Sequence, residues 1–158
     1  MTRERLKDIA EIIGILAIVA SLLFLGFEIQ QSNRIAVAST EIGIRNSYSE
    51  FNRGLYTGSD VAEVMARAQR PDAEWTEAEN LKVLLLVSDL LNVWMSVETA
   101  CQNDLAPEST CAELHDDIRA FIGMFPGTRP MWQYFVESYP SLADTEVRRT
   151  INRALGGQ

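Results

Sequence analysis

The fold is decided by residues 9–27, IAEIIGILAIVASLLFLGF. The only charged residue in this stretch is Glu11, and Asp8 and Glu28 stand at its two ends. At about 1.5 Å per residue, a helix of this length reaches roughly 28 Å, close to the ~30 Å hydrocarbon thickness of a bilayer. The stretch therefore predicts a single membrane-spanning helix. It indicates where the protein sits and not what it does.

A cleavable signal peptide is the alternative interpretation of this stretch. Residues 36–38, AVA, have the small-x-small pattern of a cleavage site, but Glu28 and Arg34 separate them from the apolar segment. We therefore expect an uncleaved signal-anchor. We expect the anchor to lie in a bacterial inner membrane. Basic residues before the segment slightly favour a cytoplasmic N-terminus, which would place the rest of the chain in the periplasm.

One other segment is apolar enough to be considered as a second membrane pass: residues 81–97, LKVLLLVSDLLNVWMSV. Lys82, Asp89 and Asn92 fall inside it, and each of these side chains is costly in hydrocarbon. A buried central helix of the extramembrane domain is the favoured interpretation.

The membrane helix is expected to continue beyond the bilayer. No proline interrupts residues 28–56, and apolar residues recur there at helical spacing. We expect one long stalk helix to about residue 56, ended at Gly58 because glycine favours the helix C-terminus.

Further helices are predicted along the rest of the chain. Capping-box patterns predict three helix starts, at residues 60–63, 76–79 and 110–113. Pro130 suits the first turn of another helix, and a last helix is expected from about Leu142 to Leu155. The predicted fold class is all-α: a transmembrane anchor in residues 1–30, then a helical domain in residues 31–158 with the stalk and a small bundle of about five helices.

The two cysteines, Cys101 and Cys111, flank a loop that contains Pro107. This spacing predicts a disulfide that closes a helical hairpin in an oxidising compartment, and two unpaired thiols are the alternative.

Composition excludes several classes of function. The net charge is −8, and an acidic domain repels phosphate backbones, so nucleic acid is not an expected partner.

His115 is the only histidine and is expected to be a solvated helix residue. Asp89 is expected to face a polar strip or to pair with an arginine, with a functional buried carboxylate as the alternative. The three tryptophans are expected in the core and at helix junctions. We predict no catalytic, metal-binding or cofactor-binding residue and no cofactor.

One face of the membrane helix carries small side chains. On a helical wheel of 100° per residue they fall within about 60° of one another; they are Ala10, Gly14, Ala17 and Ser21. A face of small residues lets a second helix approach closely in lipid. We predict a helix-packing face here, with chance as the alternative because such residues are common in membrane helices.

Four segments near the two ends of the chain form a recognisable pattern: GILAIVASL at residues 14–22, EIQQSNR at 28–34, PGTRPMW at 126–132 and EVR at 146–148. In these segments the chain resembles a widespread group of uncharacterised short bacterial proteins with one N-terminal membrane helix and a small helical domain. The resemblance implies an anchored helical domain and carries over no site. Other residues often stand at the two cysteine positions in that group, so the disulfide would be a local addition.

These observations predict a non-enzymatic, single-pass accessory subunit. It would contact the lipid bilayer and dock onto a larger inner-membrane protein complex through its membrane helix and acidic domain. The alternatives are a membrane-anchored ligand-binding or sensor domain and a self-associating homo-oligomer.

Overall fold

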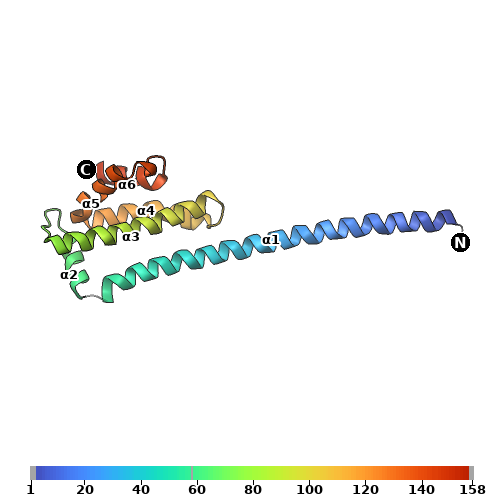
Figure 1. Cartoon of the computed structure of the whole chain (residues 1–158), viewed down its shortest axis with the longest axis horizontal. Helices are drawn as coiled ribbons and strands as arrows, with labels where there is room; N and C mark the ends of the chain where they lie inside the picture. The colour runs from blue at the N-terminus through green and yellow to red at the C-terminus, as the bar shows by residue number, and fades with distance from the viewer. Residues whose placement is uncertain (1–2, 58, 157–158) are drawn as a thin grey trace. The chain divides into compact units, whose positions relative to one another are not determined.

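The computed structural model describes residues 3–57 and 59–156, and every regular element in these ranges is helical (Figure 1). The helices are α1 (Arg3–Thr57), α2 (Ser59–Ala68), α3 (Glu77–Gln102), α4 (Glu108–Met124), α5 (Arg129–Ser138) and α6 (Glu146–Gly156). Two 3-10 turns, η1 (Pro126–Thr128) and η2 (Pro140–Leu142), flank α5. The predicted all-α class, with one long N-terminal helix and five shorter ones, is confirmed.

Helix α1 runs without interruption to Thr57, close to the predicted end. Gly58, the predicted terminator, lies outside the described residues. The chain divides into two compact units after Ala38, and this division falls inside α1. The helix therefore gives no structural mark at residue 30, where the anchor was predicted to end.

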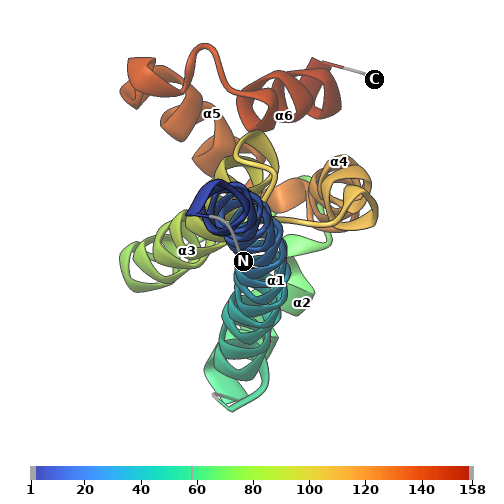
Figure 2. The same ribbon diagram turned by 90° about the vertical axis from the view of Figure 1, so that its right-hand side faces the viewer.

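The core of the second unit lies between α3, α4, α5 and α6. Figures 1 and 2 show α5 and α6 on the same side of the α3–α4 pair. Trp94 of α3 stacks on Trp132 of α5 with ring centroids 5.1 Å apart, and Phe121 of α4 meets both rings edge-on. Stacked and edge-to-face pairs of this kind add to the stabilisation from burial alone.

The last part of α1 joins this core. Ile44 is buried, and Tyr48 and Phe51 are half-buried against the core. The Phe51 ring meets Phe121 edge-on at 6.4 Å between centroids. Trp94 and Trp132 are fully buried and Trp75 is half-buried, which confirms the predicted core and junction positions of the tryptophans.

Only the second of the three predicted capping boxes forms. The Thr76 hydroxyl accepts the Glu79 N–H at 3.3 Å, and the Glu79 carboxylate accepts the Thr76 N–H at 3.0 Å. The Thr76 N–H and the Thr76 hydroxyl both donate to the Glu79 carboxylate and lower the pKa of this carboxyl, and nearby Arg67 lowers it further.

The other two capping predictions are wrong. Helix α2 already includes Asp60, whose carboxylate accepts the Val61 N–H and pairs with Lys82. Helix α4 begins at Glu108 after Pro107, so Thr110 lies inside the helix. Proline fixes φ near the value that suits a helix entrance, which moves the start upstream of the threonine.

The start of the last helix was also predicted wrongly. Residues from Leu142 to Thr145 form turns, and α6 begins at Glu146. The Thr145 hydroxyl accepts the Arg148 N–H at 3.2 Å, as an N-cap side chain does. The helix therefore begins where a cap is available.

Candidate functional site

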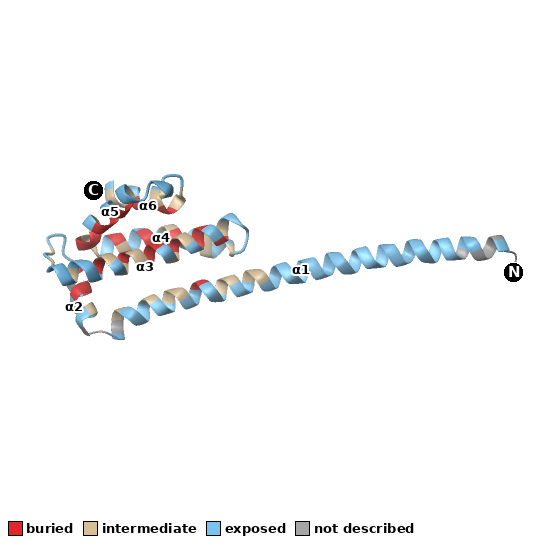
Figure 3. Ribbon diagram, viewed as in Figure 1, coloured by how far each residue is buried: buried red, intermediate tan, exposed pale blue. Residues whose placement is uncertain are grey.

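No described residue covers the apolar segment of α1. All side chains of residues 10–29 are exposed, as Figure 3 shows, and the helix is long and apolar enough to cross a membrane. Free-standing apolar surface of this extent indicates a membrane anchor or a signal segment. A core helix of a soluble protein, in contrast, would be largely buried.

The predicted helix-packing face lies on this exposed segment. Ala10, Gly14, Ala17 and Ser21 are all exposed, and a Cβ added at Gly14 would meet no atom within 4 Å. The Ser21 hydroxyl donates to the Ala17 carbonyl at 2.8 Å, so its polar group is satisfied within the helix. The face is exposed among the described residues, and its packing role stays a prediction.

The predicted disulfide is present. Cys101, in the last turn of α3, bonds Cys111, in the first turn of α4, with Cα atoms 5.8 Å apart. Both side chains are half-buried. The bond removes both cysteine thiols as nucleophiles and fixes the ends of the two helices beside each other.

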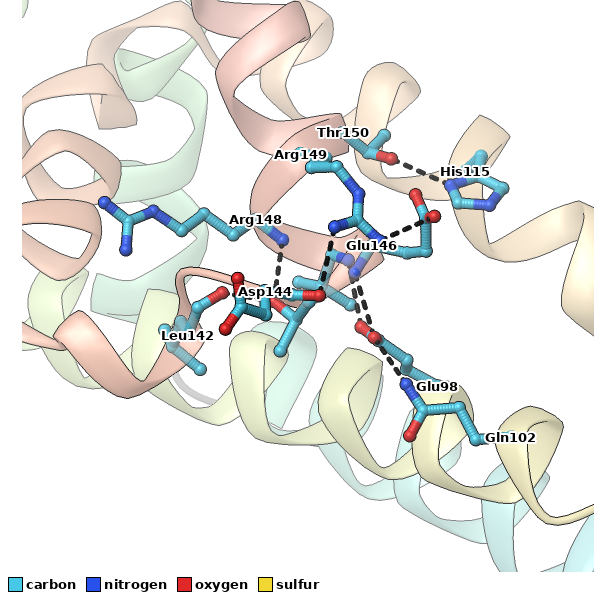
Figure 4. Close-up of polar contacts among 11 residues, drawn as sticks. Glu98, Gln102, His115, Leu142, Asp144, Glu146, Arg148, Arg149 and Thr150 are labelled. Atoms are coloured by element: carbon cyan, nitrogen blue, oxygen red, sulfur yellow. Dashed lines mark hydrogen bonds and ion pairs between the residues drawn. The ribbon is translucent and has the colours of Figure 1, made fainter.

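Sequence reasoning missed Glu98, a buried carboxylate of α3 that is 4% exposed (Figure 4). Its oxygens accept the N–H groups of Glu146 and Val147, each at 2.9 Å, and the Gln102 side-chain amide at 2.9 Å. The carboxylate thus caps the N-terminus of α6, where the helix dipole favours negative charge. The sequence places Glu98 on the apolar face of α3, one turn beyond Trp94, and this position could have indicated that it is buried. No neighbouring residue in the sequence indicates that its partner is the start of α6.

His115 also contacts α6, so its predicted position as a solvated residue is wrong. It is half-buried, and its Nδ1 lies 2.8 Å from the Thr150 hydroxyl, which is itself buried (Figure 4). The chain's only histidine therefore holds two helices together.

The disulfide stands between these two attachments of α6. Glu98 lies one helical turn before Cys101 on α3, and His115 lies one turn after Cys111 on α4. The bridge therefore fixes the spacing of the two side chains onto which α6 docks.

Asp117 of α4 is a second polar centre. Its Oδ2 accepts the Tyr48 hydroxyl and the Trp94 indole N–H, each at 2.9 Å. Burial of Tyr48, together with the charge of Asp117, raises the pKa of the Tyr48 hydroxyl above its ordinary value. This carboxylate connects α1, α3 and α4.

Asp117 lies at an open groove of about 910 Å³ between α1, α3 and α4, which we call the acidic groove. Its carboxylates come from Glu41, Glu113, Asp116 and Asp117. Three of these four are engaged inside the chain: Glu41 pairs with Arg45, Asp116 with Arg119, and Asp117 with the two aromatic donors.

A second open groove, of about 570 Å³, lies between α1, α2 and α3, and we call it the apolar groove. Its apolar lining residues are Phe51, Val61, Val64, Val83, Leu85, Leu86 and Val93. Asp89, for which a buried functional carboxylate was the alternative prediction, is exposed at the edge of the apolar groove. Asn92 is exposed on the same helix. The interpretation as a polar strip therefore fits Asp89 better than that of a buried functional group.

Within ranges 3–57 and 59–156, no group of three or more His, Cys, Asp or Glu side chains could hold a metal ion.

Comparison with protein-family models, with curated proteins and with solved structures found no match. The family resemblance stated from the sequence therefore stays a prediction.

Proposed function

We propose that this chain is a non-enzymatic, single-pass accessory subunit of a larger membrane protein complex. The exposed apolar segment of α1 carries the proposal, since a bilayer or a partner helix is what such a surface requires. Its small-residue face would let a helix of the complex approach closely. The acidic domain would dock outside the bilayer.

The contacts of the two cysteines, of the buried Glu98 and of the single histidine support a structural role for these side chains over a catalytic one. Cys101 and Cys111 are joined, Glu98 caps α6, and His115 bonds Thr150. A nucleophile or a general base must be free to meet a substrate. Each of these groups already has a partner in the fold.

Two observations support a periplasmic place for the domain. The Cys101–Cys111 disulfide forms and persists in oxidising compartments, and basic residues before the anchor favour a cytoplasmic N-terminus. A membrane-impermeant maleimide applied to whole cells, with and without reductant, tests this topology. Labelling of both cysteines only after reduction supports it, and free reactivity of the native thiols contradicts it.

Mild-detergent extraction followed by native mass measurement tests the docking role. We expect a mass above that of the monomer, containing other chains. Replacing Gly14 and Ala17 with leucine should release the protein, because the larger side chains hold a partner helix away. The matched control enlarges the opposite side, with Ile12→Phe and Val19→Leu, and should leave the complex intact. A lone monomer in the native protein would contradict the proposal.

Ligand binding is the second candidate, and the volume of the acidic groove favours it. Its 910 Å³ falls in the range of small-molecule sites, although it is open rather than enclosed. A small non-lipid mass bound to the extracted protein in native mass spectrometry would support this function. Complexes that contain only protein and lipid would argue against it.

A further inference from the structure

Helix α3 carries more apolar side chains than the fold buries. Val87, Leu90 and Trp94 are buried on its inner face, but Leu81 and Leu85 on the outer face are 55% and 57% exposed. These two leucines lie one turn apart, and Asp89 lies one turn further along the same line. A helix that is apolar on more than one face is normally covered on each of them. Among the residues that the structure describes, the outer face of α3 therefore has no partner.

The apolar groove continues this face. Leu85 stands at its edge, and its lining includes Phe51 of α1 and Val64 of α2, the latter 4% exposed. The groove is thus a depression lined by apolar side chains next to exposed leucines. This is the form of surface that receives one face of an amphipathic helix.

The rim of the groove has a net negative charge. Lys82 pairs with Asp60, and this pairing lowers the pKa of the Asp60 carboxyl. The rim carboxylates Glu50 and Asp89 form no ion pair or hydrogen bond in the described part of the chain. Charge complementarity therefore favours a partner with lysine or arginine beside its apolar face.

Other occupants fit this surface less well. An anionic lipid surface would be repelled by Glu50 and Asp89. The chain's own basic amphipathic helix, α6, already buries its apolar residues Val147 and Ile151. A second copy would thus have to unfold α6 to offer it.

We propose that the apolar groove and Leu81 and Leu85 form the docking site for a basic amphipathic helix of a partner protein. This inference rests on the proposed accessory role and names the surface and the chemistry of the contact. The apolar face of the partner helix would lie on the leucines and in the groove. Its basic side chains would lie against Glu50 and Asp89.

Photocrosslinking in cells that make the full chain tests the site. Leu85 is replaced by p-benzoylphenylalanine, and Gln133, exposed on α5, is the control position. After irradiation the crosslinked peptide is sequenced by mass spectrometry. We expect an adduct from position 85 only, to a segment whose apolar residues recur at helical spacing with lysine or arginine beside them.

Charge reversal gives the matched comparison. Glu50→Lys with Asp89→Lys should reduce the adduct about tenfold or more, because like charges then face each other. Glu63→Lys with Glu137→Lys changes net charge equally at two exposed positions outside the groove and should leave the adduct unchanged. Circular dichroism melts confirm that each variant folds. The double variant Leu81→Ser with Leu85→Ser disrupts the surface without changing its charge, and the amount of partner protein that co-purifies with it measures the effect.

Each remaining outcome overturns the inference. One group of such outcomes is an adduct to lipid, to a second copy of this chain or to a segment without basic residues. The others are no adduct at all, and an adduct that the groove variant and the control variant reduce equally. The native mass measurement separates this failure from failure of the accessory role. A heavier complex without an adduct at position 85 refutes the groove alone, whereas a lone monomer refutes the accessory role as well.

Discussion

At Gly127, in η1, the chain passes so close to the α2–α3 connection that a methyl group has no room. A Cβ there would lie 2.7 Å from the Arg70 carbonyl oxygen and 2.9 Å from the Ala73 Cβ. Backbone cannot move aside as the end of a flexible side chain can. Glycine is thus required here because another part of the backbone lies so close. Its backbone conformation does not require glycine, because its φ is not positive.

We expect Gly127→Ala to lower the free energy of unfolding by about 1–3 kcal/mol, the usual cost of forcing an extra group into a packed region. Gly123→Ala is the control, because Gly123 lies in α4 with nothing within 4 Å of an added Cβ. That change should be neutral or stabilising by up to about 1 kcal/mol. Denaturant unfolding of the full chain in detergent measures both, and equal effects would contradict the clash.

Tyr48 gives a prediction about alkaline pH. Its pKa is raised in the folded state by burial and by Asp117. A group with a raised folded pKa contributes stability that is complete below its unfolded pKa, about 10, and is lost as pH rises above that value.

We therefore expect Tyr48→Phe to have two effects. At pH 7 it should cost about 1 kcal/mol, for the lost hydrogen bond to Asp117. Above pH 10 the variant should lose less stability than the native chain does, because the phenylalanine has no proton to release. Unfolding monitored at several pH values tests this, with Tyr134→Phe on the exposed surface as control. Parallel pH curves for native chain and Tyr48→Phe would refute it.

At the scale of the helices, the disulfide and the docking of α6 are coupled. Glu98 and His115 stand one turn from Cys101 and Cys111, and both contact α6. Freedom at the ends of α3 and α4 would thus loosen both attachments at once.

Replacing both cysteines with serine should lower the free energy of unfolding by about 2–3 kcal/mol, the usual value for a short loop. Amide hydrogen exchange should show where the loss is concentrated. We expect the amides of α6 to exchange faster by a larger factor than those of α2, because local opening precedes global unfolding. A uniform change across all helices would contradict the coupling.

Local sequence signals predicted some helix boundaries and missed others. The Thr76 box was predictable, since its two hydrogen bonds join residues three apart. The patterns at Asp60 and Thr110 were misleading because a capping pattern shows only that a side chain is able to cap. Neighbouring residues decide whether the helix has already begun, as Pro107 does for α4.

The candidate site was less predictable than the fold for a physical reason. Glu98 reaches Val147, and Tyr48 reaches Asp117, across long stretches of sequence. Periodicity places each residue on a helix face but does not say which helix lies opposite. The disulfide was predictable because its two cysteines stand at the ends of consecutive helices.

At the scale of the whole molecule, the exposed apolar segment of α1 gives a prediction about membrane insertion. A charge at the middle of a membrane helix costs about 2.5–3.5 kcal/mol for insertion. Val19→Arg should therefore move a fraction of the protein from the membrane pellet to the supernatant after alkaline carbonate extraction. Gln31→Arg, beyond the apolar segment, should stay in the pellet like the native chain. Equal extraction of both variants would argue against a spanning segment.

The position of the α6 attachments also sets an order of events during synthesis. The chain is made from its N-terminus, so both cysteines and the side chains of Glu98 and His115 exist before α6 does. The first turn of α6 is capped by Glu98 of α3, and Thr150 in its second turn meets His115 of α4. The last helix to be made therefore docks onto side chains that the two preceding helices already carry when it leaves the ribosome.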